Sequence, residues 1–474
     1  MSLLDLSRWQ FAITVMFHMT FPSITVGLAI FLSVVYGLYW RTGRPVYLQM
    51  FRFWRRIFAV GFAIGVVAGA VITFQMGLNW GVYGAKTGPI IGPIIGMEVV
   101  TAFFVEAGFI GVLLYGEGRV RKGTMFLSTV MVSLGTILSS TWIIAANSWM
   151  QTPAGFKVVH GRFEPTDWMR VIFNPSFVWR WPHMVVAVLI SAGFFVAGIS
   201  AYYLVKGRAK GFARRSMSIA LGIAALLMPV QLYLGDNVAG HELPYQLSKL
   251  EAMEGNWDNG NTGFVLFAVP DQQAARNIAQ LDIPCLGSAN AKDLTCKTAT
   301  PGLKLTPAAD RPDMAATFWG FRVMWLAALL MFGTAFAATI LRMRNRLWTA
   351  RRFHHFVLWT TPVGILAILG GWVLAEAGRQ PWIVFGQLRT SDAVSKLAPG
   401  EVLFSVIGFS VLYLVMLVAY IAYILRTMRI GPERDDARHQ PPPDAPDTTA
   451  SALPGSSAVH RLTEPTGTAE VAAR

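Results

Sequence analysis

The stretch VLFSVIGFSVLYLVMLVAYIAYIL, residues 402–425, decides the fold class because it contains no charged side chain over the full length of a membrane span. A bilayer core about 30 Å thick needs roughly 20 apolar residues in a helix. The whole chain is 54% hydrophobic and only 14% charged, which lies outside the range of soluble globular proteins. We therefore expect an all-α integral membrane protein.

Further apolar runs bring the prediction to about nine transmembrane helices. Two of them are interrupted by charge: the third, from about 97 to 116, carries Glu98 and Glu106, and the seventh, from about 314 to 341, carries Arg322. The others cover residues 9–40, 57–85, 123–156, 181–205, 216–235 and 353–375. The N-terminus lacks the basic region and cleavage site of a signal peptide, so we expect the first run to be a retained helix.

The distribution of basic residues predicts the orientation. The four short loops on one side, within 41–56, 117–122, 206–215 and 342–352, hold 18 Lys or Arg residues, and the three short loops on the other side hold eight. Excess Lys and Arg mark the cytoplasmic face, so the N-terminus is expected outside and the C-terminus inside. The formal net charge of +14 is explained by this bias, and we expect no nucleic-acid partner.

These spans divide the chain into four predicted parts: helices one to six in 1–235, an external loop domain in 236–313, helices seven to nine in 314–426, and a disordered cytoplasmic tail in 427–474. The external loop contains the only two cysteines, Cys285 and Cys296. Outside the cytoplasm they can close a small disulfide loop, and the alternative is two free thiols.

Six ionisable side chains fall at membrane depth, where each is costly to bury and is a functional hypothesis by default: His18, Glu98, Glu106, His183, Arg322 and Glu376. The predicted orientation places five of them towards the outer side, with Glu98 at the outer start of the third span. Glu106 lies two turns deeper and about 80° round the helix.

The histidines allow two interpretations. A membrane histidine can simply hydrogen-bond to a neighbouring helix. His18 and His183 lie at matched depth, however, and Met324 lies at that level too. A His and Met pair gives a six-coordinate haem of raised potential that is suited to electron transfer.

The motif GWVLAEAGRQPW at 371–382 resembles the signature of subunit I of the cytochrome bd family of quinol oxidases. The resemblance extends along most of the chain, through SRWQFAITVMFHMTFP at 7–22, FQMGLNW at 74–80, GMEVVTAFFVEAGFIG at 96–111, WIIAANSWMQTP at 142–153, WPHMVVA at 181–187, SKLEAMEGNW at 248–257 and FWGFRVMW at 318–325. These motifs occur in family order and on the helices expected from hydropathy.

The resemblance implies the haem ligands. His183 and Met324 are similar to the ligands of a low-spin haem b on the outer side. His18 and Glu376 resemble the ligands of two high-spin haems, one haem b and one haem d, where oxygen is reduced. The assignment of each residue within that pair stays open.

The resemblance also implies roles for other charged residues. Glu98 matches a glutamate beside the high-spin haems, and Glu106 matches one that delivers protons. Lys249 and Glu254 match the quinol-oxidising residues of the external loop, which the family calls the Q-loop; without the surrounding motif they would be solvated charges. Arg322 could offset the charge of haem propionates or of a reduced haem, or alternatively pair with Glu376 or another carboxylate.

The remaining residues of the 371–382 motif are expected to surround the haem held by Glu376. Trp372 lies one turn earlier and is expected to pack on a porphyrin. Arg379 and Gln380 are expected at the outer interface, where charge-assisted hydrogen bonds would hold propionates or backbone. Gly378 and Pro381 are expected to end the helix.

The external segment is short, which resembles the short Q-loop branch that includes the oxidases called cyanide-insensitive. Members of that branch can lack the spectrum of haem d, so the third group is expected to be haem d or a further haem b. The length of the loop does not specify whether the substrate is ubiquinol or menaquinol.

The predicted function is a bacterial inner-membrane quinol oxidase subunit that oxidises quinol at the outer face, reduces O2 to water and charges the membrane without pumping protons. The family implies a second membrane subunit and often a small single-helix subunit. Two alternatives are a transporter, which would show broken helices or repeated halves, and an electron-relay cytochrome b, which would not need His18, Glu98, Glu106 or Glu376.

Overall fold

The computed structural model describes residues 2–287, 295, 297 and 301–432. Within that part of the chain, nine helical segments are long and apolar enough to span a membrane, which confirms the predicted fold class. Their helices are α1 (Leu3–Thr20), α2 (Pro22–Thr42), α3 (Pro45–Leu78), α4 (Gly81–Glu98), α5 (Phe104–Tyr115), α6 (Lys122–Gln151), α8 (Phe177–Lys206), α9 (Lys210–Tyr245), α12 (Met314–Met343), α13 (Arg351–Trp359), α14 (Val363–Ala377) and α15 (Pro399–Ile430).

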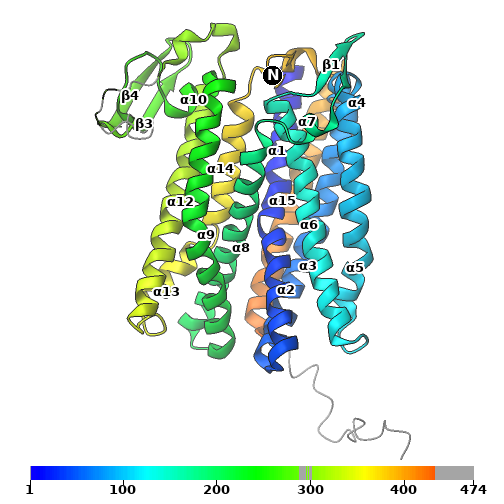
Figure 1. The fold of residues 1–474 in the computed structure, drawn as a ribbon, viewed down its shortest axis with the longest axis vertical. Coiled ribbons are helices and arrows are strands. Elements are labelled where there is room, and N and C mark those ends of the chain that lie inside the picture. The colour runs from blue at the N-terminus through cyan, green and yellow to red at the C-terminus, as the bar shows by residue number, and fades with distance from the viewer. Residues whose placement is uncertain (1, 288–294, 296, 298–300, 433–474) are drawn as a thin grey trace, which may run out of the picture.

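Two ends of the bundle can be distinguished (Figure 1). The end that we call the loop end carries residues 246–287 and 301–313, with α10 (Leu247–Glu254), and the short helix α7 (Trp168–Ile172). It also carries three antiparallel hairpins, formed by β1 (Phe156–Val159) with β2 (Arg162–Pro165), β3 (Phe264–Asp271) with β4 (Arg276–Ile283), and β5 (Trp382–Val384) with β6 (Leu388–Arg389). The opposite end, the basic end, carries the short connections 43–44, 116–121, 207–209 and 344–350.

Three of the spans are not continuous α-helices. The first is interrupted at Phe21, and Pro22 begins α2 at a position where its missing N–H costs nothing. The third contains a π-helical turn, Val99–Phe103, between α4 and α5. The eighth is divided into α13 and α14, and α14 begins at Val363, directly after Pro362. The hydropathy pattern does not reveal these interruptions, because none of them contains a charged side chain.

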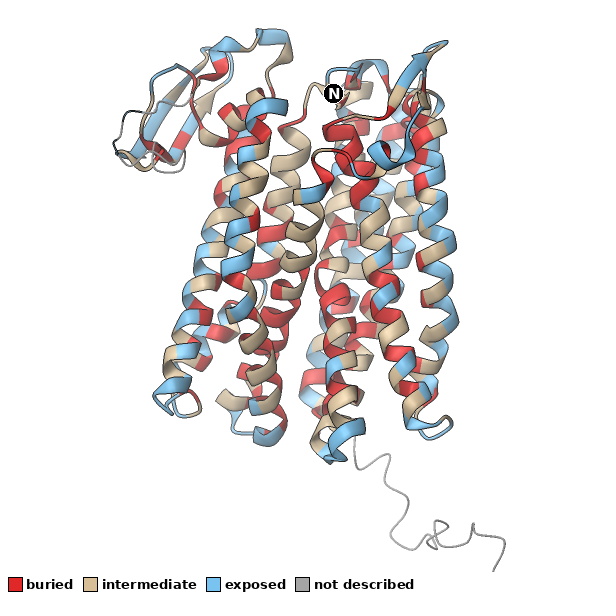
Figure 2. Ribbon diagram, in the orientation of Figure 1, coloured by how far each residue is buried: buried red, intermediate tan, exposed pale blue. Residues whose placement is uncertain are grey.

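The core forms where aromatic side chains of several helices interlock. Trp54, which is fully buried, packs against Phe53, Phe195 and Phe212. Small residues allow helices to approach closely elsewhere, as is common in membrane bundles; a Cβ at Gly364 would lie 2.5 Å from the Cα atom of Ser191. Exposed residues lie mainly along the outward faces of the helices (Figure 2).

Some boundaries differ from the predicted ones. Helix α9 continues to Tyr245 instead of ending at Gly235, so His241 and Glu242 belong to a helix and the loop begins near Gln246. Helix α6 ends at Gln151 because the following residues turn into the β1 hairpin. The predicted tail lies almost entirely outside the described residues. Cys285 takes part in a disulfide; Cys296 lies outside the described residues, so its pairing stays a prediction.

Candidate functional site

A cavity of about 570 Å³ opens at the loop end and is lined by side chains of α1, α4 and α14. Four of the predicted residues line it together, namely Trp372, Glu376, Arg379 and Gln380. The sequence motif thus brings its aromatic, acidic, basic and amide groups to one place. Two further cationic side chains, Arg8 and Arg311, also line the cavity and were not predicted.

Glu376 is held by two neighbours. The Asn147 side-chain amide of α6 donates to its Oε1 atom at 2.8 Å, and the Arg379 guanidinium pairs with its Oε2 atom. Asn147 in turn accepts a hydrogen bond of 2.7 Å from Arg180 on α8. The carboxylate is therefore oriented by amide and guanidinium donors from its own helix end and from α6.

Two guanidinium groups near Glu376 retain donors without partners. Arg379 is only 3% exposed, yet its Nε and Nη1 atoms have no hydrogen-bond partner, and the buried Nη1 atom of Arg180 has none either. Unpaired buried donors are costly. Guanidinium groups match carboxylates in a bidentate manner, so the donors of Arg379, which lines the cavity, fit a ligand that carries carboxylates, such as the propionates of a haem.

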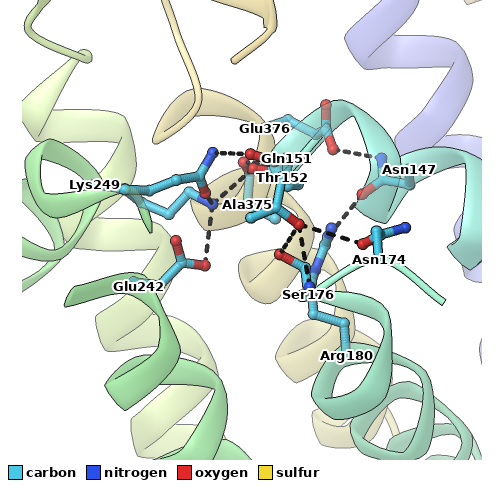
Figure 3. A network of polar contacts seen from close by, with 11 residues as sticks. Asn147, Gln151, Thr152, Asn174, Ser176, Arg180, Glu242, Lys249, Ala375 and Glu376 are labelled. Atoms are coloured by element: carbon cyan, nitrogen blue, oxygen red, sulfur yellow. Dashed lines mark hydrogen bonds and ion pairs between the residues drawn. The ribbon is translucent and has the colours of Figure 1, made fainter. Parts of the chain in front are cut away.

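Polar contacts join the main chain next to this carboxylate to α10 (Figure 3). Gln151 lies one turn after Asn147 on α6, and its side chain donates to the Ala375 carbonyl at 3.1 Å and accepts from Lys249 Nζ at 2.7 Å. Gly378 permits this approach, since a Cβ there would lie 2.5 Å from Lys249 Cγ. The glycine is needed for this close contact, and its φ of −67° is an ordinary helical value that gives it no special part in ending the helix.

Lys249 is not solvated, in contrast to what its loop position alone suggests. It is 2% exposed, and its ammonium contacts Gln151, Gln246 and Glu242, the last at 3.1 Å. Burial lowers the pKa of Lys249 to about 8, and the nearby Glu242 carboxylate opposes that shift. The ammonium remains largely charged at neutral pH because it has three oxygen acceptors.

Glu254 ends α10 on the side that faces α12. Burial raises the pKa of its carboxyl group, and the charge of Arg322 opposes that change. A carboxyl with a raised pKa is better suited to accept and release a proton near neutral pH than an ordinary surface glutamate.

Arg322 contacts the loop rather than a carboxylate oxygen. Its guanidinium, which is fully buried, donates to the main-chain carbonyls of Val265 at 2.8 Å, Met253 at 3.2 Å and Glu254 at 3.4 Å. It also lies over the ring of Phe264, 4.3 Å from the centroid. Among the described contacts Arg322 does not pair with Glu376, and the predicted contact with haem propionates stays a prediction. Arg322 fastens α10 and β3 to α12.

We predict that Arg322→Ala detaches this loop. Three buried carbonyls would lose their donor, at about 1–3 kcal/mol each, so we expect limited proteolysis to cut within 246–313 much faster than in the wild type. Arg344→Ala, a change of the same type at the basic end of α12, serves as the control. Equal cleavage rates for Arg322→Ala and the wild type would show that the loop is held by other contacts.

His183 lies on α8 and Met324 on α12, both in the half of the helix nearer the loop end. The side-chain amide of Gln231 on α9 lies 3.2 Å from His183 Nδ1, and a Cβ at Gly235 would lie 3.3 Å from His183 Cε1. Met324 faces α14, where a Cβ at Gly371 would lie 3.0 Å from its Sδ atom. Both candidate ligands therefore point towards helix surfaces that lack side-chain bulk.

His18 lies near the interruption between α1 and α2. Its Nδ1 atom is 3.1 Å from the Gly65 carbonyl oxygen of α3, and this hydrogen bond orients the ring. A main-chain carbonyl bound to one ring nitrogen fixes the tautomer and leaves the other nitrogen available for a metal.

Glu98 lies deeper than predicted. The third span begins at Gly81, so Glu98 is near its middle instead of at its outer start. The predicted span began late because α4 contains Pro89, Pro93 and several glycines, which reduced its apparent helical character.

Glu98 and Glu106 also share one face, which the sequence did not suggest. Ser139 of α6 donates to Glu98 Oε1 at 2.8 Å, and a Cβ at Gly135, one turn away on α6, would lie 2.5 Å from Glu106 Cγ. In an uninterrupted α-helix, two side chains eight residues apart point in directions that differ by about 80° around the helix axis. The π-helical turn accommodates one additional residue, so Glu98 and Glu106 are separated by about two full turns and their side chains point in nearly the same direction. Both carboxyl groups consequently face α6.

Several residues of this site were not predicted: Arg8, Arg180, Gln151, Glu242, Gln246 and Arg311. Arg180 had a usable signal, because it directly precedes the WPHMVVA motif at the start of a span. Glu242 had none, since its stretch was interpreted as loop. Gln151 lies within a quoted motif, but its role depends on a contact with α10 that local sequence does not contain.

Comparison with known proteins agrees with this arrangement. Residues 6–432 match the family described as cytochrome bd terminal oxidase subunit I. The chain is 33% identical to cytochrome bd ubiquinol oxidase subunit 1 of Bacillus subtilis, over 93% of this chain and 97% of that one. It is 32% identical to cytochrome bd-II ubiquinol oxidase subunit 1 of Escherichia coli, over 90% and 97%. The solved bd oxidase of Geobacillus thermodenitrificans has a similar fold, with a TM-score of 0.83, 27% identity, and coverage of 91% of this chain and 99% of that chain.

The bundle and its cavity define a multi-pass membrane protein with a polar site at one end. The chain belongs to the cytochrome bd terminal oxidase subunit I family. Its enzymatic class is that of a terminal quinol oxidase, and it is one subunit of an assembly that includes a second one.

Proposed function

We propose that this chain is the haem-bearing subunit, which oxidises quinol at the loop end and supports reduction of O2 to water. Two sets of contacts made by α6 carry the proposal: Gln151 binds the ammonium of Lys249, and Asn147, one turn earlier, binds the carboxylate of Glu376. The buried ammonium of Lys249 therefore binds α6 one turn away from Asn147, which is the hydrogen-bond partner of Glu376, a candidate haem ligand.

The side chains present fit three haems. His183 and Met324 would hold a low-spin haem b, because each faces a glycine on a neighbouring helix. His18 and Glu376 would hold two high-spin groups, a haem b together with a haem d or a third haem b. When bound, the haems supply the electron transfer and oxygen chemistry. Trp372 would pack on a macrocycle, while Arg379 and Gln380 would hold its polar edge.

The protein itself supplies the acid and base groups. Lys249 and Glu254 lie on α10 and would bind and deprotonate the quinol, with Arg322 holding the loop against α12. Glu106 and Glu98 would bring protons from the basic end, since both face α6 along the third span. Quinol protons released at one face and protons consumed from the other charge the membrane without a pump.

We infer that the loop end and N-terminus face outwards from a bacterial cytoplasmic membrane and that the C-terminus is cytoplasmic. The basic connections at the opposite end support this orientation. Helix α15 and the third span are largely exposed in the isolated chain. These faces would contact lipid, the second subunit and a small single-helix subunit.

The test is a dithionite-reduced minus air-oxidised spectrum of the enzyme with its second subunit, alongside His183→Ala. We expect a b-type signal in the wild type, with a far-red chlorin band if haem d is present, and loss of the low-spin b component in the variant. His355→Ala, which removes an exposed histidine of α13 at the basic end, is the matched control and should retain that component. A wild-type preparation without haem would overturn the proposal.

A further inference from the structure

The β3–β4 hairpin has one face that is apolar and exposed, and the proposed function does not use it. Residues that pair directly across an antiparallel hairpin share a face. Phe267 pairs with Leu281, and its neighbour on the same face, Val269, pairs with Ala279. Phe267 is 43%, Val269 41% and Leu281 58% exposed. We call this side of the hairpin the apolar face.

The opposite face of the hairpin is buried on β3 and polar on β4. Ala268 pairs with Gln280, and Val265 pairs with Asp282. The two β3 residues are buried together with Phe318 of α12. The two β4 residues are exposed, and the Gln280 amide donates to the Asp282 carboxylate at 2.8 Å. The hairpin is therefore amphipathic, and β3 is the strand that holds it to α12.

The apolar face continues an exposed surface of α12. The rings of Phe267 and Trp319 are in edge-on contact, with their centroids 5.3 Å apart. Trp319 is also exposed, and it begins a stripe of exposed apolar residues at the spacing of one helix face, formed with Val323, Leu326 and Leu330. A spanning helix presents such a stripe to the acyl chains of the bilayer. The apolar face thus adjoins a lipid-facing surface.

Contacts with α12 fix the depth of the hairpin. The Phe264 ring lies 5.2 Å from Trp325, centroid to centroid, and at the hairpin's tip the Gln272 side chain accepts a hydrogen bond from the main-chain N–H of Met314. From Trp325 to its end at Met343, α12 is about 27 Å long, close to the roughly 30 Å of a bilayer core. The hairpin therefore lies beside the outermost turns of α12, at the level of the lipid headgroups, and projects sideways from the bundle (Figure 1).

The backbone of the hairpin limits how deeply it can enter the bilayer. Its sheet has only two strands among the described residues, so the outer edge of β4 has no strand beside it. Open strand edges do not occur in the hydrocarbon region, because their N–H and C=O groups would have no partners there. At the headgroup level the same groups can bind water and lipid oxygens. The hairpin can therefore lie on the hydrocarbon core but not within it.

We propose that the β3–β4 hairpin is a lipid-binding surface, whose apolar face rests on the acyl chains of the leaflet at the loop end while Gln280 and Asp282 face water. Lipid is the occupant because the apolar face is continuous with Trp319 and lies beside the bundle at headgroup depth. The Val265 carbonyl of the hairpin binds Arg322, which also binds α10. Lipid contact therefore steadies the loop as a whole.

The test is photo-crosslinking of the whole enzyme, with its second subunit, in vesicles of phosphatidylethanolamine and phosphatidylglycerol. Leu281→p-benzoylphenylalanine places the probe on the apolar face, and Gln280→p-benzoylphenylalanine places it on the polar face of the same strand. We expect mass spectrometry to find lipid adducts predominantly at position 281. Equal lipid adducts at both positions, or adducts of position 281 with the second subunit or another part of this chain, would overturn the proposal. The adducts are detected whether or not the enzyme oxidises quinol, so failure here is distinct from failure of the proposed function.

A second measurement uses ordinary substitutions. Arg276 is exposed at the start of β4 and offers a site for trypsin. In vesicles, Leu281→Asp should be cut there roughly tenfold faster than the wild type, because the burial of one leucine side chain changes a local equilibrium by about that factor. Gln280→Asp, the matched control, should be cut at the wild-type rate. Equal rates for the two variants would contradict lipid contact at the apolar face.

Discussion

We expect Glu376→Ala to lower the rate of quinol-driven oxygen uptake by more than about 100-fold. Removing even the outer partners of a metal ligand costs about 10–100-fold, and this change removes the proposed ligand itself. It also leaves the guanidinium of Arg379, 3% exposed, without its carboxylate. The measurement is quinol-driven oxygen consumption by the purified enzyme, together with its haem content.

Two further variants make that result specific. Glu401→Ala removes an exposed carboxylate at the start of α15, also at the loop end, and should leave oxygen uptake unchanged. Asn147→Leu removes the 2.8 Å hydrogen bond to Glu376 and should give an intermediate loss. Full oxygen uptake by Glu376→Ala would remove this residue from the proposed ligand set.

Lys249→Met should produce the second large effect, which combines instability with loss of quinol oxidation. The substitution leaves Glu242, which is 8% exposed, as an uncompensated buried charge. Breaking a buried pair on one side costs about 3–5 kcal/mol, so the yield of folded protein should fall. The double variant Lys249→Met with Glu242→Gln removes both charges and should recover most of that stability.

The double variant separates structure from function. Thermal unfolding and haem content should return towards the wild type, while quinol oxidation should stay low because no ammonium remains to bind the substrate. Oxygen uptake driven by tetramethyl-p-phenylenediamine should persist. Recovery of quinol oxidation in the double variant would show that Lys249 serves only to neutralise Glu242.

Sequence sufficed for those parts of the structure that depend on local composition. The nine spans followed from the length of apolar runs, because a bilayer sets a minimum number of apolar residues. Trp372, Glu376, Arg379 and Gln380 could be grouped for a similar reason: they lie within one short segment at the end of α14, so they reach the same cavity. The roles assigned to them stay predictions until the experiments above are done.

The contacts that sequence could not predict join residues far apart in the chain. Lys249 meets Gln151 of α6, and Arg322 of α12 binds carbonyls of residues 253, 254 and 265. Main-chain acceptors cannot be identified from side-chain types in a sequence, which is why haem propionates, the charge of a reduced haem or a protein carboxylate were considered for Arg322 instead. The boundary of α9 was missed because polar residues continue the helix beyond its apolar part.

The π-helical turn at Val99–Phe103 has a consequence for how this protein can change over time. Substitutions within the turn alter a lipid-facing or packing surface and leave the angular position of the following residues unchanged. The loss of one residue from the turn would convert it into an ordinary α-helical turn, leave about two full turns between the two carboxyl groups and keep Glu106 facing α6. A residue lost from the α-helical part of the span would instead rotate everything after it by about 100°. The π-helical turn is therefore the place in this span where chain length can fall by one residue while the two carboxyl groups stay aligned.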